Sequence, residues 1–125
     1  MTLPRPEMDQ ALKSAFVPCL RELGFRGTYP HFRREGPTHI EVVGVQFSQW
    51  GGQFYIEVGL GDKAGESLPL AGFVPAGKLK HYHVWPRERI GANPFDYEAT
   101  PVPEVAKQAV AAVAKIDAWF LGRRT

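Results

Sequence analysis

The chain has 125 residues, of which 44% are hydrophobic, 22% charged and 12% aromatic, proportions typical of a folded globular protein. Its 15 basic and 13 acidic side chains give a net charge of +2, which is too small to specify a class of partner. The single cysteine, Cys19, excludes an internal disulfide and any metal site built from cysteines alone. The longest aliphatic run, 109–114, is far shorter than the roughly 20 residues that cross a bilayer, and the N-terminus lacks the apolar stretch of a secretion signal. We therefore expect one cytoplasmic α+β domain over residues 1–125 and no membrane partner.

The first predicted element is a helix over residues 8–23. Apolar side chains recur there at the spacing of one helical face, at Leu12, Phe16, Cys19, Leu20 and Leu23. Pro18 has no amide proton and predicts a kink or a restart near Val17. Gly24 can adopt the left-handed conformation that ends a helix. We expect Cys19, on the apolar face, to be a core residue.

Three strands are predicted next, over 29–34, 39–50 and 53–60, with Gly51-Gly52 as a hairpin turn between the second and the third. Apolar residues alternate along both strands of the hairpin, although Ile40 and Val42 disturb the alternation at the start of the second strand. In the third strand, Tyr55 and Glu57 lie on the face opposite the apolar residues.

Residues 62–78 contain many turn formers and predict a loop or a wide connection. Alternation over 79–85 predicts a fourth strand, and 87–100 is expected to be irregular, with a turn at Asn93-Pro94. A last helix is expected to begin with Thr100 as its cap and Pro101 in its first position, and to end at Gly122. The chain order predicts an antiparallel sheet of about four strands, with the N- and C-terminal helices packed on one face and the other face partly open.

Between positions 8 and 61, the order of these elements is marked by a set of core, turn and strand residues: Leu23, Gly24, Phe25, Phe32, Arg33, Phe47, Gly52, Phe54, Ile56 and Gly59. In this order they resemble the bacterial domain of unknown function 4304 family. A looser match continues through Arg87, Arg89, Ile90 and Gly91, and is weaker at Phe95, Asp96 and Tyr97. The resemblance implies a small α+β domain of bacterial origin with no assigned activity, and it supplies no catalytic residues.

Residues 78–89 form a basic strip in which four basic side chains and one acidic side chain give a local charge of +3. The basic residues are Lys78, Lys80, Arg87 and Arg89, and the aromatic residues Tyr82 and Trp85 lie between them. An acidic protein partner would use such a surface, and so would single-stranded nucleic acid, whose phosphates attract cations and whose bases stack on aromatic rings. The ordinary alternative is the solvated edge of a sheet.

His81 and His83 would share one face of a strand, a geometry that can bind zinc, copper or nickel if His31, His39, Glu41 or Glu57 adds a further ligand. Two half-exposed strand histidines are the ordinary alternative.

Two further side chains are candidates for contact with a partner. Arg33 could clamp a carboxylate or a phosphate, although a strand arginine such as Arg33 or Arg34 more often pairs with a glutamate across the sheet. Trp50 could be an exposed anchor at the hairpin tip, although burial against the first helix is the favoured expectation for it, and Trp85 and Trp119 could simply close the core.

Catalysis has little support in the sequence. Ser48 and Ser67 lack the context of a nucleophile elbow, and no glycine-rich loop matches a phosphate-binding motif. Glu41 and Glu57 could pair as catalytic carboxylates only if the strand register brings them opposite each other. The sequence therefore favours a non-enzymatic binding domain without a cofactor, acting through the open face or the basic strip, with an immunity-type protein that blocks a toxin as one version by analogy. A metal-dependent small-molecule binder or enzyme using His81 and His83, and a single-stranded nucleic acid binder, are the alternatives.

Overall fold

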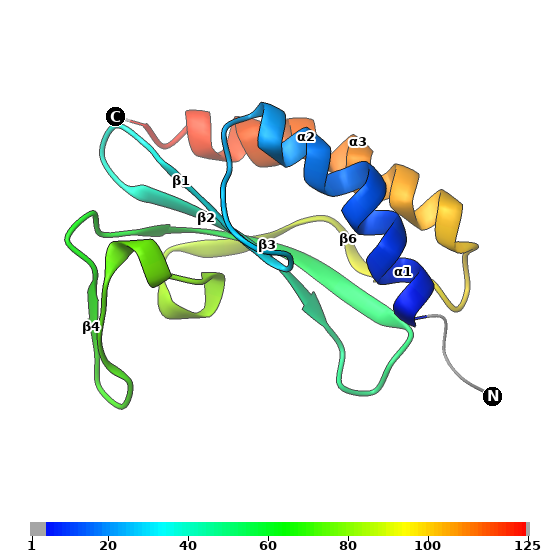
Figure 1. Ribbon diagram of the computed structural model, residues 1–125, viewed down its shortest axis with the longest axis horizontal. Helices are drawn as coiled ribbons and strands as arrows, with labels where there is room; N and C mark the ends of the chain where they lie inside the picture. The colour runs from blue at the N-terminus through cyan, green and yellow to red at the C-terminus, as the bar shows by residue number, and fades with distance from the viewer. Residues whose placement is uncertain (1–4, 125) are drawn as a thin grey trace.

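The computed structural model describes residues 5–124. Two long helical segments cover one face of a four-stranded antiparallel sheet (Figure 1). The strand order is β1-β2-β3-β6, formed by β1 (His31–Glu35), β2 (Ile40–Phe47), β3 (Gln53–Gly61) and β6 (Arg87–Asp96). The predicted α+β class, and the placement of the N- and C-terminal helices on one face, are confirmed.

The N-terminal helical segment contains a π turn just before its proline. It is formed by α1 (Arg5–Ala11), the π turn η1 (Leu12–Phe16) and α2 (Val17–Glu22). The residues that it buries completely recur every four positions, at Met8, Leu12, Phe16 and Leu20. A regular helix has about 3.6 residues per turn, so four-residue steps drift around its axis. The wider π turn offsets this drift and keeps the four side chains on the core, which is the local irregularity that Pro18 predicts.

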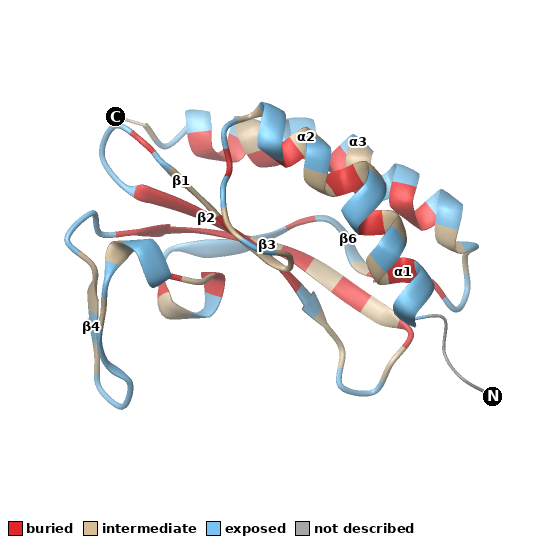
Figure 2. Cartoon of the chain, viewed as in Figure 1, coloured by how far each residue is buried: buried red, intermediate tan, exposed pale blue. Residues whose placement is uncertain are grey.

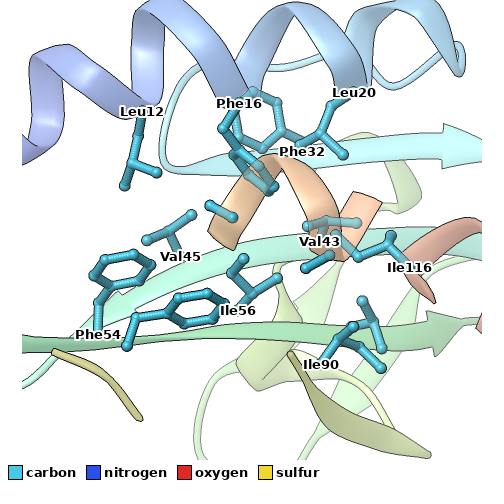
Figure 3. Packing of buried hydrophobic residues seen from close by; sticks show 14 of the residues in the cluster. Leu12, Phe16, Leu20, Phe32, Val43, Val45, Phe54, Ile56, Ile90 and Ile116 are labelled. Carbon is cyan, nitrogen blue, oxygen red and sulfur yellow. The ribbon is translucent and has the colours of Figure 1, made fainter. Parts of the chain in front are cut away.

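The hairpin register places one face of β2 and β3 under the helices. Val43 pairs with Val58 and Val45 with Ile56, and all four side chains are buried. Figure 3 shows Leu12, Phe16 and Leu20 pointing from the helix toward Val43, Val45, Phe54 and Ile56 of the sheet. Cys19 lies at the margin of this core, half-buried, where its Sγ donates to the carbonyl of Ala15 at 3.4 Å.

The prediction for the fourth strand is wrong in its position. Residues 79–85 form no strand, and the expected irregular segment contains β6, which pairs with β3 from Gly59↔Arg87 to Gln53↔Asp96 across a bulge. The bulge removes the regular alternation by which a strand is recognised. The alternation over 79–85 instead comes from a short 3-10 turn, η3 (His81–His83), whose flanking residues Leu79 and Val84 are buried.

The segment between β3 and β6 crosses the face of the sheet opposite the helices. It contains the hairpin of β4 (Glu66–Leu68) and β5 (Gly72–Val74), the 3-10 turn η2 (Ala76–Lys78) and η3, at the lower left of Figure 1. Its apolar residues form a second, small cluster with the sheet, made of Ile40, Val42, Leu79 and Val84. This cluster explains why Ile40 and Val42 disturb the apolar alternation of β2. The rest of that face stays open, as expected.

The C-terminal helix α3 (Val102–Leu121) starts later than expected. Pro101 is its N-cap, Thr100 precedes the helix, and no side chain caps its first amides. Trp119 on α3 is buried, whereas Trp50 and Trp85 are 86% and 78% exposed, so the favoured expectation that Trp50 is buried is wrong, and Trp85 does not close the core. Figure 2 shows the buried stripe of α3 turned toward the sheet. None of the helices in residues 5–124 combines the length and the hydropathy that spanning a bilayer requires.

Candidate functional site

Glycines on the open face of the sheet let the chain of residues 79–86 lie directly on the strands. A Cβ atom on Gly44 would overlap the imidazole of His81, and one on Gly59 would lie 2.6 Å from Cγ2 of Val84. Strand glycines often mark such a close approach of another segment. The glycines therefore fix the position of η3, and with it the histidines and Tyr82 that border two hollows on this face.

The first hollow, which we call the glutamate hollow, has a volume of about 450 Å³ and is lined by Gln46, Glu57, His81, Tyr82, Trp85, Arg87, Glu88 and Arg89. Glu57 lies on its floor. One oxygen of the Glu57 carboxylate accepts from Nε of Arg89 at 3.0 Å, and the other lies 3.3 Å from Nε2 of His81. Arg89 in turn stacks on the ring of Tyr55 at 3.7 Å. The Glu57 carboxylate is therefore already paired within the protein.

His81 is 1% exposed and is held as a neutral ring. Burial lowers its pKa, and Arg87 and His83 lower it further, although the negative charge of Glu57 acts in the opposite direction. Its Nε2–H group faces the side-chain oxygens of Glu57 and Gln46, the latter at 3.2 Å. Its Nδ1 atom lies over Gly44 and has no hydrogen-bond partner among the described residues. Nε2 of His81 is thus occupied by Glu57 and Gln46, and Nδ1 is buried against Gly44.

The second hollow, which we call the cationic hollow, has a volume of about 530 Å³ and lies on the other side of Tyr82. Three basic side chains line it together with aromatic and small residues, and none of the lining residues carries a carboxylate. The lining residues are Arg33, Phe73, Val74, Pro75, Gly77, Lys78, Lys80, Tyr82 and His83. Within the described part of the chain, Arg33, Lys78 and Lys80 form no salt bridge. This hollow attracts anions.

Tyr82 forms the wall between the two hollows. Its ring packs edge-on against His81 at 5.2 Å and against His83 at 4.5 Å between ring centroids, yet it remains 51% exposed. The ring is therefore fixed in position and still accessible. Trp85, which lines the glutamate hollow, stands exposed beside it.

The structure separates the two histidines that the sequence places on one face. In the 3-10 turn, His81 points into the glutamate hollow and His83 into the cationic hollow, where Nδ1 of His83 accepts from the amide of Lys80 at 3.1 Å. Across residues 5–124, no group of three histidine, cysteine, aspartate or glutamate side chains has the arrangement of a metal site. The strand geometry on which the metal hypothesis depends is absent.

The two strand arginines behave differently. Arg34 pairs with Glu41 on the neighbouring strand at 2.7 Å, which is the ordinary alternative considered for a strand arginine. Arg33 points to the opposite face, where its Nε donates to the carbonyl of Leu79 at 3.4 Å and its side chain borders the cationic hollow. Glu41 pairs with Leu60 in the sheet register and Glu57 with Gly44, so the two carboxylates lie on opposite faces and form no pair.

The predicted basic strip is divided by Tyr82, with Lys78 and Lys80 in the cationic hollow and Arg87 and Arg89 in the glutamate hollow. Trp50 lines neither hollow and stands at the tip of the β2–β3 hairpin.

Sequence reasoning missed Gln46 and Phe73 as lining residues. Strand alternation does place Gln46 on the face that carries Glu57. For Phe73, the feature of the sequence that could have indicated a surface role is a large aromatic residue within a turn-rich segment.

Residues 16–120 match the family described as Domain of unknown function (DUF4304). The chain belongs to this family. The DUF4304 match extends from the end of η1 to the end of α3 and therefore includes both hollows. No curated protein and no solved structure matches the chain. Since the description of DUF4304 assigns no activity, the function has to be argued from the hollows and their side chains.

Proposed function

We propose that this DUF4304 chain is a non-enzymatic binding domain that recognises an acidic segment of a protein partner through the open face of its sheet. The observation that carries the proposal is a row of exposed aromatic side chains on that face, Phe73, Tyr82 and Trp85, which stand among basic groups. Exposed tryptophan and tyrosine beside arginine are the residue types that contribute most binding energy in protein interfaces.

Charge complementarity favours an acidic partner. The two hollows together are lined by five basic and two acidic side chains, and one of the acidic ones, Glu57, is paired with Arg89 and His81. An acidic segment lying across Tyr82 would neutralise Lys78, Lys80 and Arg87 while covering the aromatic rings.

The same geometry argues against catalysis and against a nucleic acid strand. Both nitrogens of His81 are occupied or turned inward, so the hollow offers no free general base of that kind. A single strand needs a basic groove that follows several phosphates. Here the basic charge gathers in one hollow, and the neighbouring hollow has equal numbers of basic and acidic side chains.

The test uses the purified chain as bait in a lysate of the source organism, followed by binding of the captured protein, prepared separately, to defined variants. We expect Trp85→Ala and Arg87→Glu each to weaken that binding by about tenfold or more, and added salt to weaken binding of the unchanged protein. Trp50→Ala is the matched control, since it removes an equally exposed tryptophan that lines neither hollow.

A captured protein that binds Trp85→Ala and Arg87→Glu as tightly as the unchanged chain contradicts the proposal, as does capture of RNA or DNA in its place. The proposal is also contradicted if every protein captured by the unchanged chain is captured equally by Trp85→Ala and Arg87→Glu, or if the unchanged chain captures no protein.

A further inference from the structure

We propose that the cationic hollow is a binding site for a small phosphorylated ligand that carries an aromatic ring, of the nucleoside phosphate class. This goes beyond the recognition of a protein partner, because the ligand is small and binds without that partner. The basic groups come from three separate places in the fold: Arg33 from β1, Lys78 from η2 and Lys80 from the residue before η3. The fold thus brings together three cations that are up to 47 positions apart in the sequence.

These charges are uncompensated within the described residues. No carboxylate lines the hollow, and the three cations form no salt bridge with any described residue. A phosphoryl group carries up to two negative charges and several acceptor oxygens, and so satisfies three basic side chains that line one hollow better than one carboxylate does.

Two histidines lie near the three cations: His83 lines the hollow, and the pKa of His31 is lowered by burial and in part by Lys80 and Arg33. Burial lowers the pKa of His31 to about 4, with further lowering by Lys80, His81, Arg33 and His83. The pKa of His83 is also lowered, by burial and then by Lys80. Both rings are therefore neutral at physiological pH and add no charge to the three cations, while Lys80 acts on both of them.

Arg33 is positioned to bind a phosphoryl group. Its Nε–H group donates to the carbonyl of Leu79 at 3.4 Å, which fixes the guanidinium at the border of the hollow and leaves its two terminal nitrogens for a ligand. A guanidinium held in this way can present two parallel donors to a phosphoryl group.

The walls of the hollow suit a planar ring. Tyr82 is fixed by edge contacts with His81 and His83 and still exposes half of its surface, and Phe73 of β5 lines the same hollow. A base can stack on such a ring while its phosphate reaches the cations. The volume of about 530 Å³ lies within the range of small-molecule sites.

A single small ligand fits better than a polymer. The cationic hollow ends at Tyr82, and on the other side of that ring Arg89 is already paired with Glu57, while Glu88 offsets Arg87. The surplus of positive charge therefore does not continue as a track along the face.

The experiment is titration calorimetry of the full chain with ADP, with adenosine and inorganic phosphate as separate arms. We expect ADP to bind one to one and more tightly than either fragment. Arg33→Gln and Lys80→Gln should each weaken ADP binding by about tenfold. Tyr82→Leu should weaken binding of ADP but leave binding of inorganic phosphate unchanged. Arg87→Gln, in the glutamate hollow, is the matched control and should leave ADP binding within about twofold.

Absence of saturable ADP binding overturns the proposal, as does equal weakening by Arg87→Gln or no weakening by the substitutions in the cationic hollow. Binding of inorganic phosphate as tight as that of ADP, unaffected by Tyr82→Leu, overturns the part that concerns the aromatic ring. Should Arg33→Gln fail to fold, Lys78→Gln provides the same test, because Lys78 is exposed and makes no hydrogen bond through its side chain to another described residue. These titrations contain no protein partner, so their failure leaves the proposed protein interface standing.

Discussion

Glu41 is a buried carboxylate that joins the start of β2 to the residues after α3. It is 1% exposed and accepts from Nε of Arg34 at 2.7 Å and from Nε of Arg124 at 2.8 Å. Arg34 also reaches Asp117 on α3 at 3.2 Å. Burial raises the pKa of Glu41, but the hydrogen bonds and charges of the two guanidinium groups outweigh it, and the net pKa is lowered. The carboxylate is therefore ionised at neutral pH.

Glu41→Gln is expected to reduce the free energy of unfolding at neutral pH by about 3 kcal/mol, because it leaves two guanidinium groups around a neutral amide. Since the folded-state pKa of Glu41 is depressed, the carboxylate's contribution is present above its ordinary value of 4.5 and is lost as the pH falls through the folded-state value. Urea denaturation measures both effects. Glu104→Gln is the control: its pair with Lys107 is exposed, and its loss should change stability by less than about 0.5 kcal/mol. Equal effects of the two substitutions would show that the pairing of Glu41 with Arg34 and Arg124 contributes no more to stability than an exposed ion pair.

Individual residues differ in how far the sequence predicts them. Pairing of a strand arginine with Glu41 was an expectation, and Arg34 does this because it lies directly opposite Glu41 in the β1–β2 register. Arg124 gave no such signal, because it lies 83 positions from Glu41 and only the packing of α3 brings it there. Similarly, the exposure of Trp50 depends on the path of the hairpin tip, which periodicity does not specify.

At the scale of elements, β6 is the strand that periodicity misses. Its buried residues Ile90 and Phe95 are separated by a bulge, so no period-two pattern relates them. Phe95 nonetheless stacks on Phe54 of β3, with ring centroids 4.8 Å apart and an angle of 2° between the ring planes. The N-terminal helix was predicted well because its buried positions repeat over four turns, and the proline within it marks the irregular turn.

We expect Phe95→Ala to reduce the free energy of unfolding by about 3–5 kcal/mol, since it removes a fully buried ring from the main core. Trp85→Ala removes a larger side chain from the segment that was expected to be a strand, and should cost less than about 1 kcal/mol because that ring is exposed. Thermal or urea unfolding of both variants compares them directly. A larger loss for Trp85→Ala would place the core against residues 79–85 instead of β6.

At the scale of the whole molecule, three histidines on the open face make the folded state less stable as the pH falls. The pKa values of His31, His81 and His83 are all lowered, primarily by burial. Groups with a depressed folded-state pKa bind protons more readily when the chain is unfolded, so acid favours unfolding.

The free energy of unfolding is expected to be constant near neutral pH and to fall as the pH is lowered from the ordinary histidine value of 6.5 toward the value of about 4 for His31. Urea denaturation at a series of pH values measures the slope. His31→Phe keeps a ring against His81 and removes one titrating group, so its slope between these values should be smaller. An unchanged slope in His31→Phe would show that His31 does not contribute.

Only part of the candidate site could be predicted from the sequence. The basic strip, Tyr82 and Trp85 were recognised from local composition, and Arg33 from its place in a strand. Their division into a cationic hollow and a glutamate hollow could not be predicted, because it follows from the 3-10 turn at His81–His83 and from the contact of that turn with Gly44. Local sequence indicated which side chains were available, and tertiary packing decided which of them meet.

The small apolar cluster under residues 79–84 has a consequence for how this fold can be altered. Leu79 and Val84 contact Ile40 and Val42, whereas the helices pack on a separate and larger cluster on the other side of the sheet. Local opening of the segment between β3 and β6 would therefore leave the main core intact. We expect changes in the length of this segment to leave the main core folded, provided that Gly44 and Gly59 are kept, because a Cβ atom on either glycine would collide with His81 or Val84. In this sense the helices and the sheet form a scaffold whose main core is separate from the segment between β3 and β6.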